Sequence, residues 1–287
     1  MGGIYWLASY PKSGNTWFRA VLANYLSESE QPVGINDLNT GTIASSRVWA
    51  DEVLGIDTAD LTQDEIDRLR PDVYRWTAIE RSDLIRYHKI HDAYSRRPDG
   101  APLVDSYASL GAIYILRNPL DIVPSLANHD GIDLDLAIDY MADPLHCLAR
   151  SKTKLPRQLL QRLGTWSQHV ESWVDTLDIK IKILRYEDMQ SDPICAFGSA
   201  FDFLGLSIHS EKLKRAIIAC RFENLAIQEE TYGFIDRPVK NKKFFRKGKV
   251  GDWLESLTAS QIDRIIQDHH KVMRRFGYLD AHNCPLF

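Results

Sequence analysis

The apolar positions of this chain follow two different periods. Short runs rich in β-branched and aromatic side chains predict buried strands at residues 4–8, 84–91, 111–116 and 179–186. Elsewhere apolar side chains recur every three or four residues, which predicts helices over about residues 16–26, 119–129, 166–177, 192–204, 210–221 and 259–276, and shorter helical pieces within 42–86. Residues 28–40 are polar and rich in turn formers, so we expect a loop there.

Strands that alternate with helices predict a mainly parallel sheet covered on both faces. The expected fold is therefore a P-loop-like, three-layer α/β/α arrangement. Neither an internal repeat nor a linker divides the chain, so we expect a single domain over residues 1–287. In such folds a ligand binds beyond the carboxyl ends of the strands.

Composition narrows the class of protein. The chain has 287 residues, of which 44% are hydrophobic and 26% are charged, as in ordinary globular proteins. Its net charge of −4 argues against a surface adapted to nucleic acid. The four cysteines have no paired spacing, and no run is apolar enough to span a membrane or to form a secretory signal. We therefore expect a cytoplasmic protein with no membrane span and no nucleic-acid partner.

The most informative turn follows the first predicted strand. Residues 10–17 read YPKSGNTW, and they join that strand directly to the first predicted helix. Backbone N–H groups of such a turn and the helix N-terminus point at one spot, which makes a cradle for an anion. It is not the ordinary nucleotide loop, because Lys12 precedes Gly14 instead of following the last glycine. The alternative is a simple turn with a solvated lysine.

Three further groups of residues could carry chemistry. Arg117 and Ser125 follow the strand at 111–116, and residues 246–248 (RKG) lie in a stretch, 237–250, that contains no acidic residue. Lys89 and His91 are alternate residues of a predicted strand, so their side chains share a face. A histidine next to an anion cradle suits a general base at neutral pH, although a structural role is an alternative.

Together these residues resemble the sulfotransferases that use 3′-phosphoadenosine 5′-phosphosulfate (PAPS). YPKSGNTW resembles the 5′-phosphosulfate loop, residues 115–119 (ILRNP) with Ser125 resemble the 3′-phosphate element, and residues 245–253 (FRKGKVGDW) resemble the C-terminal Arg-Lys-Gly element. Lys89-Ile90-His91 stands in the place of the catalytic Lys-Thr-His segment. Residues 186–189, Phe222, Trp166 and His169 also match in order, so the resemblance covers nearly the whole chain.

The resemblance implies a role for each matched residue. Lys12 would hold the oxygen that bridges phosphate and sulfate, and His91 would accept the acceptor's proton while Lys89 steadies charge. The 5′-phosphate would be bound by Ser13, Gly14, Asn15 and Thr16. The 3′-phosphate would be bound by Arg117, Ser125, Arg246, Lys247 and Gly248, where a guanidinium offers paired donors. Trp17 and Phe222 would sandwich the adenine, and Tyr186 would reach its edge.

The implied reaction is an in-line transfer of a sulfuryl group from PAPS to a hydroxyl, or less favourably an amine, which leaves the product 3′-phosphoadenosine 5′-phosphate (PAP). Positioning and charge stabilisation dominate such transfers, and the lysines would make a metal unnecessary. The chain departs from the family at Asn15 and Ile90, which each replace a threonine. Leu254 and Ala259 replace residues of a dimerisation motif, so the oligomeric state stays open.

Two other functions fit parts of the sequence. A P-loop kinase or NTPase would share the sheet and the cradle, and a non-catalytic module could bind a polyanion through residues 237–249. The acceptor, whether a small molecule, a glycan or a lipid, is not determined. We expect residues 28–88 and 130–163 to form its pocket or lid, with these aromatic candidates: Trp49, Tyr74, Trp76, Tyr87 and Tyr140.

Overall fold

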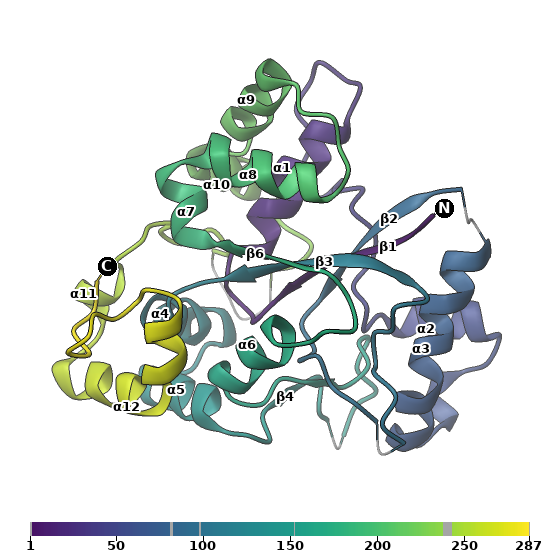
Figure 1. Cartoon of the computed structure of the whole chain (residues 1–287), viewed down its shortest axis with the longest axis horizontal. Coiled ribbons are helices and arrows are strands. Elements are labelled where there is room, and N and C mark those ends of the chain that lie inside the picture. The colour runs from purple at the N-terminus through teal and green to yellow at the C-terminus, as the bar shows by residue number, and fades with distance from the viewer. Residues whose placement is uncertain (1, 81–82, 98, 152, 238–242, 287) are drawn as a thin grey trace. The chain divides into compact units, whose positions relative to one another are not determined.

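The computed structural model describes residues 2–80, 83–97, 99–151, 153–237 and 243–286. The chain forms two compact units, and each is assembled from three separate segments (Figure 1). Unit 1 contains residues 1–10, 41–114 and 143–183, and unit 2 contains residues 11–40, 115–142 and 184–287.

Unit 1 holds most of the central sheet. Its strands are ordered β2-β1-β3-β6, with β1 at Gly3–Ser9, β2 at Ile85–Ile90, β3 at Ser109–Leu116 and β6 at Ile181–Arg185. β1 pairs in parallel with β2, from Gly3 opposite Ile85 to Ala8 opposite Ile90. Helices flank this parallel sheet, so the predicted three-layer α/β fold is confirmed. The carboxyl ends of β3 and β6 continue into unit 2.

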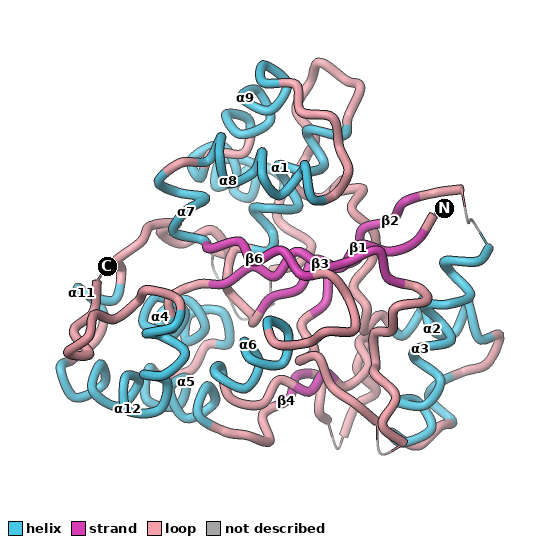
Figure 2. Tube along the Cα trace, viewed as in Figure 1, coloured by secondary structure: helices cyan, strands magenta, loops and turns pink. Residues whose placement is uncertain are grey.

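Around the sheet, unit 1 carries α2 (Arg47–Leu54), a short 3₁₀ helix η1 (Thr58–Asp60), α3 (Gln63–Glu80) and α6 (Trp166–Val174). Between residue 143 and α6 the chain is mostly loop, broken by the short strands β4 (Cys147–Leu148) and β5 (Gln161–Arg162), which pair with each other (Figure 2). β1 is buried on both faces, as the apolar run predicts. Its Trp6 packs edge-on against Tyr74 of α3, with ring centroids 4.8 Å apart.

Unit 2 is built from helices. They are α1 (Asn15–Leu26), α4 (Pro119–Asp130), α5 (Leu134–Ala142), α7 (Tyr186–Ser191), α8 (Pro193–Phe203), α9 (Ser210–Ala219), α10 (Phe222–Tyr232), α11 (Trp253–Ser256) and α12 (Ala259–Arg275). α4 starts as its sequence predicts, with Pro119 in the first turn and the Asn118 side chain accepting from Leu120 N, and it continues through Pro124. Gly277, which follows the predicted helix at 259–276, has a φ of +71° and ends α12 in the left-handed conformation typical of helix C-termini.

Several predictions need correction. Leu177 is 99% exposed because α6 ends at Val174, before the apolar period reaches it. Trp76 is 49% exposed, since the buried side of α3 runs through Ile66, Val73 and Tyr74. Helices α5, α7, α10 and α11 were not predicted. The first two and α11 have nine residues or fewer, and α10 is weakly amphipathic. β2 ends at Ile90, so His91 lies just beyond the strand and does not alternate with Lys89 within it.

A buried ion pair fastens α3 to the segment that follows β2. Both terminal nitrogens of Arg70 donate to the two carboxylate oxygens of Asp92, each at 2.9 Å, and both side chains are almost fully buried. Burial by itself would lower the pKa of Arg70, but the adjacent Asp92 carboxylate raises it above its ordinary value. Arg70 therefore stays charged, and its hydrogen bonds to Asp92 hold the backbone next to His91.

We expect Arg70→Met to lower the free energy of unfolding by about 3–5 kcal/mol, because it leaves the Asp92 carboxylate buried without its cation. Lys214→Met is the matched control, since the partner of Lys214 is the exposed Glu211 and such pairs contribute about 1 kcal/mol or less. Urea denaturation of both variants measures the difference. Equal losses would show that the Arg70–Asp92 pair contributes no more than a surface pair.

Burial also changes the pKa of three histidine side chains. His88 and His169 in unit 1 and His269 in unit 2 are buried, and desolvation lowers the pKa of each from 6.5 to about 4. Between these two values the unfolded chain binds more protons than the folded protein. Their stabilising contribution is therefore complete above pH 6.5 and is lost progressively as the pH falls toward 4.

We accordingly expect the free energy of unfolding to fall between pH 7 and pH 5, by up to about 2 kcal/mol per histidine. Denaturation at several pH values tests this, with His269→Leu expected to show a smaller fall because one titrating group is gone. A stability that stays constant from pH 7 to pH 5 in the wild type would contradict the prediction.

Candidate active site

The turn after β1 lies in unit 2 and has an unusual backbone. Lys12 and Gly14 both have positive φ, at +69° and +102°. A Cβ on Gly14 would lie 2.6 Å from the ring of Tyr186, so the chain needs glycine there both for conformation and for space. Alternating left-handed residues turn successive N–H groups toward one side, which is the geometry of an anion-binding nest.

The start of α1 offers hydrogen-bond donors to the same side. The first turn of α1 holds no acidic residue, and no side chain caps its N-terminus. Ser13 is 1% exposed, and its hydroxyl has no hydrogen-bond partner among the residues that the structure describes. A buried hydroxyl without a partner is costly, and a helix N-terminus favours negative charge. The predicted 5′-phosphate cradle of Ser13, Gly14, Asn15 and Thr16 thus fits an anionic group.

Lys12 is held by an aromatic ring. Its ammonium lies 4.0 Å from the centroid of Phe244, in the distance range of a cation–π contact. Phe244 is itself fixed, since its backbone N–H donates to the buried Glu229 carboxylate at 2.7 Å and that of Phe245 does so at 2.9 Å. Lys12, which the sequence analysis identified, is therefore held in position by Phe244, which the sequence analysis did not identify.

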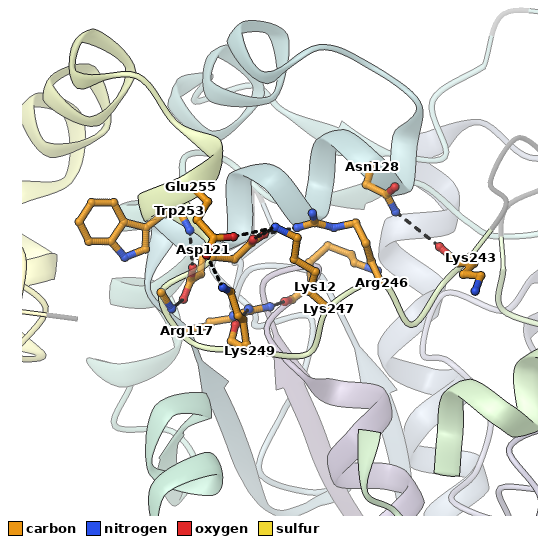
Figure 3. A network of polar contacts seen from close by, with 12 residues as sticks. Lys12, Arg117, Asp121, Asn128, Lys243, Arg246, Lys247, Lys249, Trp253 and Glu255 are labelled. Atoms are coloured by element: carbon orange, nitrogen blue, oxygen red, sulfur yellow. Dashed lines mark hydrogen bonds and ion pairs between the residues drawn. The ribbon is translucent and has the colours of Figure 1, made fainter. Parts of the chain in front are cut away.

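Arg117, at the carboxyl end of β3, joins the main parts of the unit 2 site (Figure 3). Its two terminal nitrogens donate to the carbonyl oxygens of Lys12 and Lys249, both at 3.1 Å. Its guanidinium lies 4.2 Å over the Tyr186 ring. The third nitrogen, Nε, is buried without a hydrogen-bond partner in the described part of the chain. Arg117 therefore retains donor capacity that a phosphate could use.

The Arg-Lys-Gly element packs onto the predicted adenine-binding aromatics. A Cβ on Gly248, whose φ is +60°, would lie 2.0 Å from a ring carbon of Phe222. The amide of Gln190 donates both to the carbonyl of Gly248 and to the hydroxyl of Tyr186, each at 3.0 Å. Trp17 packs edge-on against Tyr186, with centroids 5.7 Å apart. The contacts thus connect four residues that the sequence analysis assigned to the nucleotide: Trp17, Tyr186, Phe222 and Gly248.

Acidic residues neutralise the basic stretch. Arg246 and Lys247 both donate to Asp252, and Lys249 donates to Glu255 at 2.9 Å (Figure 3). Burial would raise the pKa of Asp252, but its hydrogen bonds to the two cations outweigh burial and lower it. The stretch is therefore part of a folded ion-pair network. Two of its basic residues, Lys240 and Lys242, lie outside the described residues.

Two buried carboxylates that sequence reasoning missed bind backbone N–H groups of the site. Asp121 on α4 accepts from Gly251 N at 2.9 Å and from Trp253 N at 3.1 Å. The half-buried Ser125 follows one turn later on the same side of α4. Glu187 accepts from Asn118 N and from the Tyr278 hydroxyl, both at 2.9 Å, and burial raises its pKa. An acid inside an apolar run, as at Leu120-Asp121-Ile122, is the signal that would have indicated such a role.

His91 lies in unit 1 with its ring orientation fixed. Its Nδ1 is 2.8 Å from the carbonyl oxygen of Ser9 and 3.3 Å from that residue's hydroxyl. A carbonyl oxygen only accepts, so Nδ1 carries the hydrogen and the lone pair of the neutral ring is on Nε2. That tautomer is the one in which Nε2 can take a proton. Lys89 is half-buried on β2 opposite Leu7, and its carbonyl accepts from Ala44 N at 2.7 Å.

The candidate aromatics of the acceptor pocket divide by burial. Trp49 stacks on His88 with centroids 4.4 Å apart, Tyr74 is buried and donates to Ala44 O at 3.0 Å, and Tyr87 stacks on Tyr5. Tyr140 is half-buried, whereas Trp76 is about half exposed. The contacts of Trp49, Tyr74 and Tyr87 are therefore packing contacts within unit 1. Whether any of these aromatics lines a pocket stays a prediction.

Two kinds of feature were not found in the described part of the chain. Within those residues no group of three or more His, Cys, Asp or Glu side chains is arranged to hold a metal ion. Likewise, none of the described helices is both long enough and apolar enough to cross a membrane.

Known proteins resemble this chain along nearly its whole length. The sulfotransferase domain family matches residues 4–277. A flavonol 3-sulfotransferase of Flaveria bidentis is 24% identical over 271 residues, which cover 90% of this chain and 78% of that protein. Cytosolic sulfotransferase 16 of Arabidopsis thaliana is 25% identical over 283 residues, or 92% of this chain and 75% of that protein.

Solved structures share the fold. A mouse sulfotransferase, SULT7A1, complexed with PAP has a TM-score of 0.60 at 18% identity, covering 95% of this chain and 85% of its own. A retinol dehydratase in a complex with retinol and PAP has a TM-score of 0.62 at 17% identity. The match covers 94% of this chain and 81% of the dehydratase chain. Since the family matches both units and includes every residue assigned to the site, this protein belongs to the sulfotransferase family of enzymes.

Proposed function

We propose that this enzyme transfers the sulfuryl group of PAPS to a hydroxyl of an acceptor molecule, with an amine as the less favoured acceptor. The observation that carries the proposal is the arrangement around Arg117 in unit 2. There the turn of Lys12, the Arg-Lys-Gly element and Tyr186 contact a single buried guanidinium. The turn of Lys12, the strand end that carries Arg117 and the Arg-Lys-Gly element are the three sequence elements that resemble the PAPS-binding elements of the family.

The residues of unit 2 would hold the nucleotide. Donors at the start of α1 and the Ser13 hydroxyl suit the 5′-phosphate. Arg117, Ser125, Arg246, Lys247 and Gly248 would bind the 3′-phosphate. The unused donor of Arg117 supports this assignment, and Trp17, Phe222 and Tyr186 provide rings for the adenine. The mouse sulfotransferase and the retinol dehydratase are both complexes with PAP, and this supports PAPS as the donor here.

PAPS supplies the sulfuryl group. As the acceptor oxygen forms its bond to sulfur, the bond from sulfur to the phosphate oxygen breaks, and its electron pair leaves with PAP. His91 takes the acceptor's proton on Nε2, and the Ser9 carbonyl stabilises the resulting imidazolium through Nδ1–H. Lys12 and Lys89 stabilise the negative charge that develops on the leaving phosphate and on the sulfate oxygens. This chemistry assigns no step to a metal.

The acceptor class is supported by the relatives. Flavonol and retinol, the molecules in two of the related names, both carry hydroxyl groups. A hydroxyl-bearing small molecule is therefore the first choice for this enzyme, ahead of a glycan or a lipid. We keep residues 28–88 and 130–163 as the proposed pocket segments within one functional domain. The name cytosolic sulfotransferase 16 likewise supports a cytoplasmic location.

Contacts of the basic stretch weigh against the polyanion-binding alternative. Asp252 and Glu255 pair with Arg246, Lys247 and Lys249, so those cations do not form a uniformly positive surface. Salt-dependent binding of RNA without sulfate transfer would revive that alternative. Magnesium-dependent turnover of ATP, with none of PAPS, would instead favour the kinase or NTPase alternative.

We expect His91→Ala to lower turnover by about 10²-fold or more, the contribution of a general base, while PAP binds with nearly unchanged affinity. The measurement is transfer of labelled sulfate from PAPS to a panel of flavonols, other phenols, alcohols, sugars and amines, together with calorimetry of PAP binding. His282→Ala, which changes an exposed histidine, serves as the control. A His91→Ala enzyme with most of its activity would remove His91 from the mechanism.

Gly248→Ala should weaken PAP binding by about tenfold or more, because the new methyl group would collide with Phe222 and displace the phosphate-binding backbone. Gly205→Ala is the matched control. Gly205 has a φ of +74°, but no atom lies within 4 Å of its added Cβ, so this change introduces backbone strain alone. Calorimetry with PAP should show near wild-type affinity for the control. Equal affinities of the two variants would contradict the assignment of Gly248.

A further inference from the structure

Helix α6 presents two donors to the backbone that follows β2. His169 Nε2 lies 3.0 Å from the carbonyl oxygen of His91, and Trp173 Nε1 donates to the carbonyl oxygen of Asp92 at 2.9 Å. The two donors are four residues apart, so they lie one above the other on one side of the helix. They meet two successive carbonyls, and those carbonyls lie just beyond the end of β2.

The tautomer of His169 follows from its partners. The His91 carbonyl can only accept, so Nε2 of His169 carries the hydrogen. Nδ1 is then the acceptor, and the Tyr114 hydroxyl 2.8 Å away donates to it. Tyr114 and His169 are both fully buried, and the Tyr10 ring packs edge-on against the imidazole. Burial keeps His169 neutral, since its pKa is lowered to about 4.

His91, the proposed base, is therefore held by two hydrogen bonds. Its ring is oriented by the Ser9 carbonyl, and its main chain is held by His169. The next residue is fixed as well, through the Asp92 carboxylate on Arg70. Because His91 lies outside the strand, loss of the His169 hydrogen bond would leave its carbonyl with one constraint fewer. A shift of about 1 Å in a reacting group can cost about 10² in rate.

We propose that His169 is a positioning residue for the reaction, which holds the His91 backbone so that His91 Nε2 meets the acceptor hydroxyl. Tyr114 supports this role, because its hydrogen bond fixes the tautomer of His169. The inference rests on the proposed function of His91, and it adds a role for two fully buried residues.

The test compares three substitutions in the full-length enzyme. His169→Leu should lower kcat by about 10–100-fold and leave the KM for PAPS and the affinity for PAP within about twofold. His169→Gln should recover part of kcat, because an amide can both donate to the His91 carbonyl and accept from Tyr114. Tyr114→Phe should lower kcat less than His169→Leu does, since it removes only the group that fixes the tautomer.

The matched control is His269→Leu, which removes an equally buried, neutral histidine from α12. It should lower stability but leave kcat unchanged. A double-mutant cycle supplies the sharper readout. If His169 acts through His91, adding His169→Leu to His91→Ala causes no further loss in single-turnover transfer of sulfate.

The outcomes separate the two proposals. An inactive His91→Ala with a fully active His169→Leu would overturn the positioning role and leave the proposed function intact. An active His91→Ala would overturn the proposed function itself. Additive losses in the double variant, or parallel losses of kcat and PAP affinity in His169→Leu, would show a merely structural histidine. Should His169→Leu fail to fold, the same comparisons with His169→Gln and Tyr114→Phe decide.

Discussion

The buried guanidinium of Arg117 is the contact on which the unit 2 site depends. It would be costly to bury this charge without partners, and the carbonyls of Lys12 and Lys249 together with the Tyr186 ring provide them. The partners belong to the turn after β1, to the basic stretch at residues 237–250 and to the start of α7. One side chain at the end of β3 therefore sets where three distant segments meet, and it keeps a donor for the ligand.

Carboxylates provide the complementary constraint. Asp121, Glu187 and Glu229 accept from backbone N–H groups of the site, while Asp252 holds two cations. The proposed site for a highly anionic nucleotide is thus built on buried acids. This resolves an apparent conflict in the sequence, where a net charge of −4 accompanies a cluster of basic motifs. The acids fix the loops, and the donors that they leave without a partner, on Ser13 and Arg117, are those assigned to the nucleotide in the proposed function.

In unit 1 the organising contacts are backbone carbonyls. The carbonyl of Ser9 sets the tautomer of His91, and the carbonyl of His91 sets the tautomer of His169. Both tautomers thus follow from a main-chain oxygen that accepts from the ring. The proposed general base is therefore oriented by main-chain geometry, which tolerates sequence change provided that the strands and α6 keep their places.

The sequence by itself determined the strands that carry the site, the parallel α/β class, the family and the residue types of the cradle, because apolar period and motif spacing are local properties. It did not indicate that Leu177 would be exposed, that His91 would lie beyond β2, or that Asp252 would pair with Arg246 and Lys247. Burial depends on segments far apart in the chain, and the ion pairs of Asp252, which join residues only five and six positions apart, depend on how the loop between them folds. For the same reason only the tertiary structure decided the partners of Arg117 and the tautomers of His91 and His169: each depends on a carbonyl that lies nearby in space and far away in sequence.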